Sequence, residues 1–215
     1  MKSNITWFIL LKSLLLFIIV TVLVVTENTP TANFNHAFYL LIAERIHPTL
    51  TAIATWIGNL THWYGYTPVI LFLLILPRTR MKAGLPIASV LSVSAILGPL
   101  VLKNIFAIER PAINQLIAPG GFGYPSGHSM NAAVFFGMCA LLVVRHAKSK
   151  PLKIGFTVFA LLSILLVGLS RIYLGVHTVT DVIGGYLAGS VVICAAVLTE
   201  RRIRGKTDHK LEVSQ

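Results

Sequence analysis

The sequence predicts an all-α polytopic membrane protein, with six transmembrane helices and short interfacial helices between spans 1 and 2. Hydrophobic residues make up 55% of the 215 residues and charged residues only 12%, whereas a soluble domain carries about 25% charged residues. Several uncharged runs also approach the ~20 apolar residues that cross a bilayer as a helix. The length is enough for one domain, so we expect residues 1–215 to form a single membrane-embedded domain.

Six apolar runs correspond to the expected spans. They are Leu14–Val25, Gly65–Leu76, Ala83–Leu102, Met130–Val144, Ile154–Ser170 and Val182–Thr199. No small-x-small cleavage site follows the first run, so we interpret it as an uncleaved span that starts near Trp7. The apolar spacing from Phe34 to Ile46 indicates an amphipathic helix in the membrane interface, and Thr51–Leu60 is expected to form a second short helix.

The positively charged residues occur in short clusters between these runs. With six spans, 14 of the 18 lysine and arginine residues fall on one side, which the positive-inside rule makes cytoplasmic. We therefore expect a multi-pass protein of the cell membrane with both termini in the cytoplasm. The opposite face keeps only Arg45, Lys103, Arg110 and Arg171. Because the charge is confined to clusters, the net charge of +11 does not indicate nucleic-acid binding.

Three polar segments are expected on that opposite face. They are Lys103–Pro111 after the third span, Tyr124–Ser129 before the fourth, and Ser170–Asp181 between the fifth and sixth. Ionisable groups at the ends of apolar spans are costly to keep there, which makes them functional candidates. Because alternate span ends meet the same membrane face, the three segments should lie at a similar depth.

Two cations and a proline mark the first segment. Lys103 and Arg110 are seven residues apart, which is two helical turns, so we expect both side chains on one face of a helix that Pro111 ends. Two cations at this spacing suit an anionic group such as phosphate. Snorkelling of both side chains to the interface is the alternative.

A capped helix start defines the second segment. Ser126 is a good N-cap and Gly127 allows close backbone approach, so the N–H groups of the following helix can bind an anion. His128 then lies at the edge of that site, where a proton donor could act. The alternative is a capped helix with an incidental histidine. Gly120, Gly121 and Gly123 just before it are expected to form a pliable loop, either a lid or a simple turn.

A histidine and an aspartate characterise the third segment. His177 and Asp181 are four residues apart, which predicts one helical face, and Arg171 adds a third cation. A carboxylate can orient the imidazole and leave its other nitrogen free to attack. A lone pair of this kind is more often structural, but the second histidine and the cations on the same face favour a catalytic role.

Together the motifs Lys103-x6-Arg110-Pro111, Pro125-Ser126-Gly127-His128 and Ser170-Arg171-x5-His177-x3-Asp181 resemble the three signature segments of the type 2 phosphatidic acid phosphatase family. The resemblance implies that His177 is the nucleophile that forms a phosphohistidine, that Asp181 orients it, and that His128 protonates the leaving oxygen. It also implies phosphate-binding residues, namely Lys103, Arg110, Ser126, Gly127 and Arg171. No metal or other cofactor is implied, and the sequence offers no carboxylate cluster to bind a metal.

The expected function is hydrolysis of a lipid phosphate at the extracytoplasmic face of the bilayer. Phosphatidylglycerol phosphate, phosphatidic acid and undecaprenyl diphosphate are the candidate substrates. Three alternatives stay open, namely a lipid phosphotransferase with the same site, a vanadium haloperoxidase, and a transporter or lipid-binding protein with an anion site. The haloperoxidases are typically large and soluble, which the six spans oppose. Headgroup choice depends on residues in loops 26–64 and 111–124, and the sequence fixes neither that choice nor the oligomeric state.

Overall fold

The computed structural model describes residues 3–62, 66–69, 71, 75, 85–111 and 115–213, and within these ranges it contains helices and no strand. Among these described residues, five helical stretches are long and apolar enough to cross a membrane: Asn4–Val25, Pro86–Phe106, Gly127–His146, Lys150–Tyr173 and Val179–Ile203. The predicted all-helical membrane fold is confirmed to that extent. The remaining expected span, Gly65–Leu76, lies largely outside the described residues.

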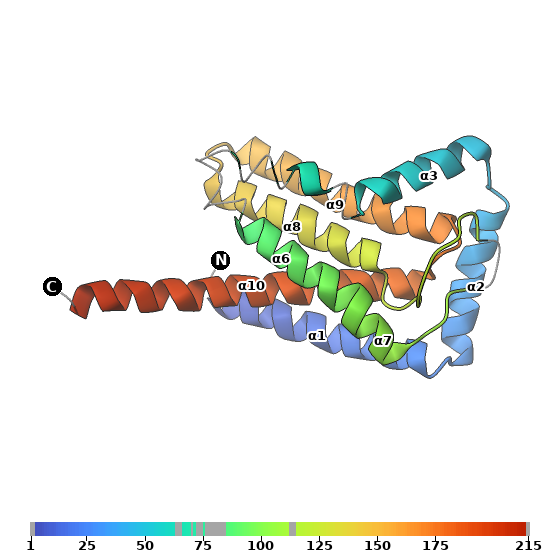
Figure 1. Cartoon of the computed structure of the whole chain (residues 1–215), viewed down its shortest axis with the longest axis horizontal. Coiled ribbons are helices and arrows are strands. Elements are labelled where there is room, and N and C mark those ends of the chain that lie inside the picture. Colours follow the sequence, from blue (N-terminus) through green and yellow to red (C-terminus); the bar gives the residue numbers. More distant parts are fainter. Residues whose placement is uncertain are drawn as a thin grey trace.

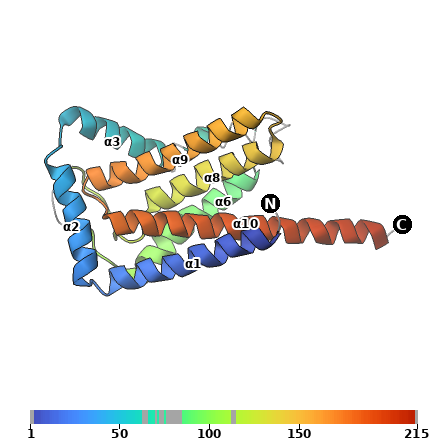
Figure 2. The ribbon, with the colours of Figure 1, turned by 180° about the vertical axis from the view of Figure 1, so that it is seen from behind.

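The described helices are α1 (Ser3–Val25), α2 (Thr29–Ala43), α3 (Pro48–Leu60), α6 (Leu85–Ile96), the π-helix η2 (Leu97–Leu102), α7 (Lys103–Phe106), α8 (Gly127–His146), α9 (Lys150–Tyr173) and α10 (Val179–Val213). The long helices α1, α6, α8, α9 and α10 run roughly side by side, and α2 crosses one end of this bundle (Figures 1 and 2). The chain termini lie toward the other end. Helix α8 packs against both α9 and α10, and α1 packs against α10.

Side-chain caps fix where several helices begin. Asn28 accepts a hydrogen bond from the Thr31 N–H and starts α2, with a proline in the first turn. Ser149 caps α9 in the same way through the Leu152 N–H. Such caps satisfy backbone donors that the first helical turn leaves unpaired. Helices α2 and α3 lie in the segment for which two short helices were predicted, and their interfacial location remains a prediction.

Small residues bring α8 and α10 into close contact. A Cβ added at Gly185 would lie 2.5 Å from the backbone oxygen of Ser126, and one at Gly189 would lie 2.9 Å from the Cβ of Ala133. The backbones of the two helices therefore approach more closely than larger side chains would permit. This approach places the start of α8 against the first turns of α10, where the Ser126 N–H donates to the Asp181 backbone oxygen over 3.0 Å.

We expect Gly185→Ala to lower the free energy of unfolding by ~1–3 kcal/mol, because the new methyl group would overlap backbone that cannot rotate away. Gly155→Ala in α9 is the matched control, since its Cβ would meet no heavy atom within 4 Å. Alanine is the better helix former, so that control should gain roughly 0.5–1 kcal/mol. Thermal unfolding of both purified variants in detergent checks the pair, and a Gly185→Ala protein as stable as wild type would contradict the packing argument.

Candidate functional site

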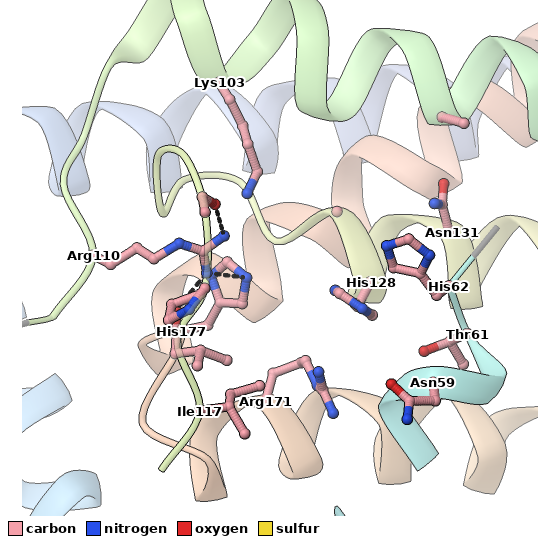
Figure 3. Close-up of a pocket in the computed structure, with 15 residues that line it drawn as sticks. Asn59, Thr61, His62, Lys103, Arg110, Ile117, His128, Asn131, Arg171 and His177 are labelled. Carbon is pink, nitrogen blue, oxygen red and sulfur yellow. Dashed lines mark hydrogen bonds between the residues drawn. The ribbon is translucent and has the colours of Figure 1, made fainter. Parts of the chain in front are cut away.

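A pocket of about 460 Å³ opens where α3, α8, α9 and the loops around α7 and α10 meet (Figure 3). All three polar segments reach it. Its described polar lining residues are Asn59, Thr61, His62, Lys103, Arg110, His128, Asn131, Arg171 and His177. These side chains are cations, imidazoles, amides and a hydroxyl, and no carboxylate is among the described lining residues. The described residues also contain no cluster of three histidine, cysteine, aspartate or glutamate residues. A lining of this composition suits an anion.

Lys103 and Arg110 both reach the pocket, but the prediction that they share one helix is wrong. Helix α7 ends at Phe106, where Ala107 adopts a left-handed conformation with φ of 49°, and no helix continues to Pro111. The two side chains therefore enter the pocket from a helix and from the loop that follows it.

The Lys103 ammonium is buried and donates a hydrogen bond to the backbone oxygen of Phe122 over 2.7 Å. The Gly123 N–H in turn donates to the oxygen of Ile108 over 2.7 Å, which ties the glycine-rich loop to the chain after α7. A Cβ at Gly123 would lie 3.0 Å from the oxygen of Glu109, so the close approach favours glycine there. The loop thus supplies an oxygen to a buried cation.

Arg110 fastens the same loop to the start of α10. Its Nε donates to the Gly121 oxygen and its Nη2 to the Gly120 oxygen, each over 2.9 Å. Its Nη1 donates to the oxygen of Val176 over 2.9 Å and lies 3.2 Å from Nε2 of His177. Burial lowers the pKa of Arg110, and the charge of Asp181 opposes that shift. The guanidinium stays charged at neutral pH.

His177 and Asp181 are in contact, although not through one helical face as predicted. Helix α10 begins at Val179, so His177 precedes it. The contact comes from the helix cap instead: Asp181 N–H donates to Thr178 Oγ1 over 3.2 Å, and Thr178 N–H donates to Asp181 Oδ2 over 2.9 Å. The same Oδ2 lies 3.3 Å from Nδ1 of His177. This reciprocal cap fixes the carboxylate beneath the imidazole.

The partners of His177 decide which ring nitrogen carries the proton. A guanidinium has donors only, so the Nε2 that faces Arg110 must be the acceptor, and the proton is on Nδ1 and is donated to Asp181. In this tautomer the Nε2 lone pair accepts the hydrogen bond from Arg110 Nη1, on the side of the ring that lines the pocket. Burial lowers the pKa of His177 to about 4, and the hydrogen bond and charge of Asp181 act in the opposite direction. The imidazole is therefore neutral at pH 7.

Ser126 and Gly127, at the start of α8, differ in whether they line the pocket. Ser126 is the N-cap, as predicted, and its Oγ accepts from the N–H and the Oγ of Ser129 over 3.4 and 3.0 Å. Ser126 is fully buried and is not among the residues that line the pocket, and Asp181 likewise lies behind His177. Gly127 does line the pocket, and a Cβ there would meet no heavy atom within 4 Å. The backbone at Gly127 is thus open toward the pocket.

Arg171 of α9 lines the pocket, and contacts with α3 determine the position of its side chain. Its side chain is buried, and its Nη2 donates to the Ala54 oxygen over 2.8 Å. A Cβ at Gly58 would clash directly with the guanidinium, because it would lie 1.8 Å from Nη2. The Ala54 oxygen of α3 therefore orients Arg171, and Gly58 leaves the space that its guanidinium occupies.

The C-terminal end of α3 and the two residues after it supply pocket residues that were not predicted from the sequence. Asn59, Thr61 and His62 line the pocket, and the His62 ring lies 5.7 Å from that of His128 between centroids (Figure 3). Burial and the nearby Arg171 charge lower the pKa of His62. The signal that could have found His62 is its position as an ionisable group just before an apolar run.

A second missed contributor is Asn35 of α2. Its Nδ2 donates to Thr180 Oγ1 over 2.9 Å, and its Oδ1 accepts from the Thr180 N–H over 3.3 Å. Thr180 Oγ1 is also 3.0 Å from Thr178 Oγ1, the cap of α10. Helix α2 thereby braces the turn that carries His177 and Asp181.

Known proteins resemble this chain over most of its length. The model of the PAP2 superfamily matches residues 83–204. Phosphatidylglycerophosphatase B of Bacillus subtilis (strain 168) is 43% identical over 91 residues, which are 41% of this chain and 44% of that protein, so the match spans less than half of that relative. Undecaprenyl-diphosphatase of Sulfolobus acidocaldarius is 29% identical over 206 residues, or 93% of each chain.

Two solved structures share the fold. The crystal structure of a transmembrane PAP2 type phosphatidylglycerolphosphate phosphatase from Bacillus subtilis superposes with a TM-score of 0.80 at 28% identity, over 90% of this chain and 96% of that one. That of Aquifex aeolicus LpxE gives a TM-score of 0.59 at 27% identity, over 76% and 92% of the two chains.

The neutral state of His177 predicts how stability depends on pH. Its pKa in the folded protein is about 4, below the ordinary value of 6.5, so the unfolded chain binds more protons between those values. Stability should therefore fall as pH drops from about 6.5 to 4, by roughly 3 kcal/mol from this group. Thermal unfolding in detergent from pH 4 to 8 measures it.

His177→Gln should flatten that part of the stability profile, and His36→Gln on the exposed face of α2 is the matched control. If wild type and His177→Gln lose stability in parallel over this range, the buried neutral imidazole described above is contradicted.

Proposed function

The chain belongs to the PAP2 superfamily, and from that premise we propose that it is an integral-membrane lipid phosphatase that hydrolyses a phosphomonoester or diphosphate of a lipid. One observation carries the proposal: Nε2 of a buried, neutral His177 faces a pocket lined by Lys103, Arg110 and Arg171. The names of the relatives support this reading, since they are a phosphatidylglycerophosphatase and an undecaprenyl-diphosphatase. Phosphatidylglycerol phosphate, phosphatidic acid and undecaprenyl diphosphate are the candidate substrates.

In the proposed first step, the substrate phosphate binds between the three cations and the open backbone at Gly127. Arg110 Nη1 exchanges its hydrogen bond to Nε2 of His177 for one to the phosphate, which frees the Nε2 lone pair. Nε2 then attacks phosphorus and forms a phosphohistidine while the bond to the leaving oxygen breaks. The imidazole becomes positively charged as it attacks, and Asp181 stabilises that charge through Nδ1–H. The cations match the charge that develops on the phosphoryl oxygens.

His128 is the proposed proton donor in that step, because it lines the pocket at the start of α8 beside the backbone of Gly127. It would give its proton to the leaving oxygen, so that the lipid departs as a neutral alcohol or a protonated phosphate. In the second step His128 takes a proton from water, which attacks phosphorus and releases inorganic phosphate and His177. Because cations and backbone N–H groups balance the charge, we propose that no metal ion takes part.

The proposed topology has six spans, of which Gly65–Leu76 would be the one outside the described residues. Helices α2 and α3 would lie in the extracytoplasmic interface. Two observations support this arrangement. Helices α8 and α10 begin toward the end of the bundle that α2 crosses, and the termini lie toward the opposite end, as do the end of α8 and the start of α9, which carry Arg145, Lys150 and Lys153 (Figure 1). Both termini would then be cytoplasmic, and residues 1–215 would form one domain with its site on the other face.

Phosphate release from a panel of lipid phosphates by the purified protein in detergent tests the proposal. Wild type should release phosphate from at least one lipid, with equal rates in the presence and absence of EDTA. His177→Ala should lower the rate at least about a hundredfold, as loss of a covalent nucleophile does. His146→Ala, an exposed histidine at the far end of α8, is the matched control.

Release by His177→Ala near the wild-type rate would refute the nucleophile assignment. A reversible loss with EDTA that Mg²⁺ restores would refute the proposal that cations alone balance the charge. Transfer of phosphate to an added lipid acceptor in place of release would identify a phosphotransferase.

The two histidines should differ in their response to the leaving group. General-acid help is worth ~10²–10⁴-fold and matters most for a poor leaving group such as a lipid alkoxide. His128→Ala should therefore lose less activity on p-nitrophenyl phosphate than on the lipid, whereas His177→Ala should lose activity on both. Single-turnover assays measure this, and equal losses of the two variants on both substrates would contradict the division of roles.

A further inference from the structure

The pocket has two ends of different chemistry. In Figure 3, Lys103, Arg110 and His177 gather at one end, and His62, Asn131, Thr61 and Asn59 gather at the other. His128 and Arg171 lie between the two ends. A volume of about 460 Å³ lies within the usual size of a small-molecule site, so the pocket has room for more than the phosphoryl group.

The order of these side chains along the pocket indicates where the leaving group of a substrate would lie. Attack by His177 and departure of the leaving oxygen take place on opposite sides of phosphorus, because phosphoryl transfer is in line. A phosphate held at the cationic end therefore directs its leaving group away from His177, past His128. This places the first atoms of the leaving group among Asn59, His62 and Asn131, which we call the far subsite.

Hydrogen bonds orient the polar groups of the far subsite. Ser94 is fully buried in α6 and donates its hydroxyl proton to Asn131 Oδ1 over 2.8 Å. That bond fixes the amide so that its Nδ2 donor is on the opposite side, and in Figure 3 that nitrogen faces the pocket beside His62. Thr61, next to His62 in the chain, is buried and donates to the Gly58 oxygen over 3.0 Å. The subsite thus presents amide and imidazole groups.

The far subsite lacks the features of a hydrocarbon site. Burying amides and imidazoles against an acyl chain costs free energy, because their hydrogen bonds to water would be lost without replacement. Among the described lining residues, the far subsite contains no lysine, arginine or carboxylate. Arg171 lies between this subsite and the cationic end where the phosphate would bind. Oxygen-bearing groups close to phosphorus fit such a lining.

We propose that Asn59, His62 and Asn131 bind the leaving group of the substrate, and that this group carries hydrogen-bonding oxygens next to the phosphorus, as a glycerol backbone or a second phosphate does. The inference rests on the proposed phosphatase function and extends it to residues outside the three signature segments. Asn59 lies in the last turn of α3 and His62 follows two residues after the helix, and α3 also positions Arg171, so one short segment serves both the cation and the leaving group.

The test compares substrates that share a phosphate and differ in the leaving group. They are phosphatidylglycerol phosphate, undecaprenyl diphosphate and dodecyl phosphate, the last of which leaves as an oxygen-poor hydrocarbon alcohol. The variants are His62→Phe, which keeps a ring without hydrogen bonds, and Asn59→Ala at an exposed position. His62→Gln restores an amide, and His146→Ala is the control.

His62→Phe and Asn59→Ala should each lower kcat/KM about tenfold on at least one oxygen-rich substrate, the scale of one lost hydrogen bond. Activity on dodecyl phosphate should change by less than about twofold, and His62→Gln should recover part of the loss. A loss confined to undecaprenyl diphosphate would identify a second phosphate as the ligand, and a loss confined to phosphatidylglycerol phosphate would identify the glycerol.

Equal losses on all three substrates, or no loss on any, would overturn the far subsite while the phosphatase function stands. Wild-type protein that releases phosphate from none of them would refute the proposed function itself, and the subsite with it.

Discussion

The first turn of α10 is the constraint on which the site depends. One oxygen of Asp181 lies 3.3 Å from Nδ1 of His177 and accepts the Thr178 N–H over 2.9 Å, while the backbone oxygen of the same residue accepts the Ser126 N–H. A single residue thereby joins the imidazole, the cap of α10 and the cap of α8. Gly185 makes this possible, because only a residue without a side chain lets the two helix starts meet. Asn35 of α2 braces the same turn from outside.

The cations of the pocket are held by backbone oxygens. Lys103 binds the oxygen of Phe122, Arg110 binds those of Gly120 and Gly121, and Arg171 binds that of Ala54. Carbonyl oxygens orient a cation without cancelling its charge, so the pocket stays electropositive toward an incoming anion. The loops and α3 therefore determine the positions of the three cations. A carboxylate in place of these carbonyl oxygens would weaken the positive potential of the pocket. This arrangement is the physical basis for the charge balance proposed for phosphoryl transfer.

Helix α3, although short, contributes to the pocket in two ways. Its glycine at position 58 admits the Arg171 guanidinium, and the residues that follow line the pocket opposite His177. The chemistry of the pocket thus changes from cationic to neutral and polar along its length (Figure 3). In the proposed reaction this gradient separates the group that is transferred from the group that departs, and it assigns substrate choice to a segment with no recognisable motif.

Three features follow from the amino-acid sequence alone: apolar helices long enough to cross a membrane, the Ser126 cap of α8, and three polar segments that meet at one pocket. They follow from local periodicity, from capping chemistry and from the alternation of span ends, all of which can be recognised in the sequence without a structure. Other features depend on contacts between distant segments and became apparent only in the folded protein. Lys103 and Arg110 meet through a loop because Ala107 ends α7, and His177 meets Asp181 through a cap that α8 and α2 support. Residues of α3 reach the site because α3 packs against α9. Periodicity predicts which face of a helix a side chain occupies, but it does not predict which other helix packs against that face.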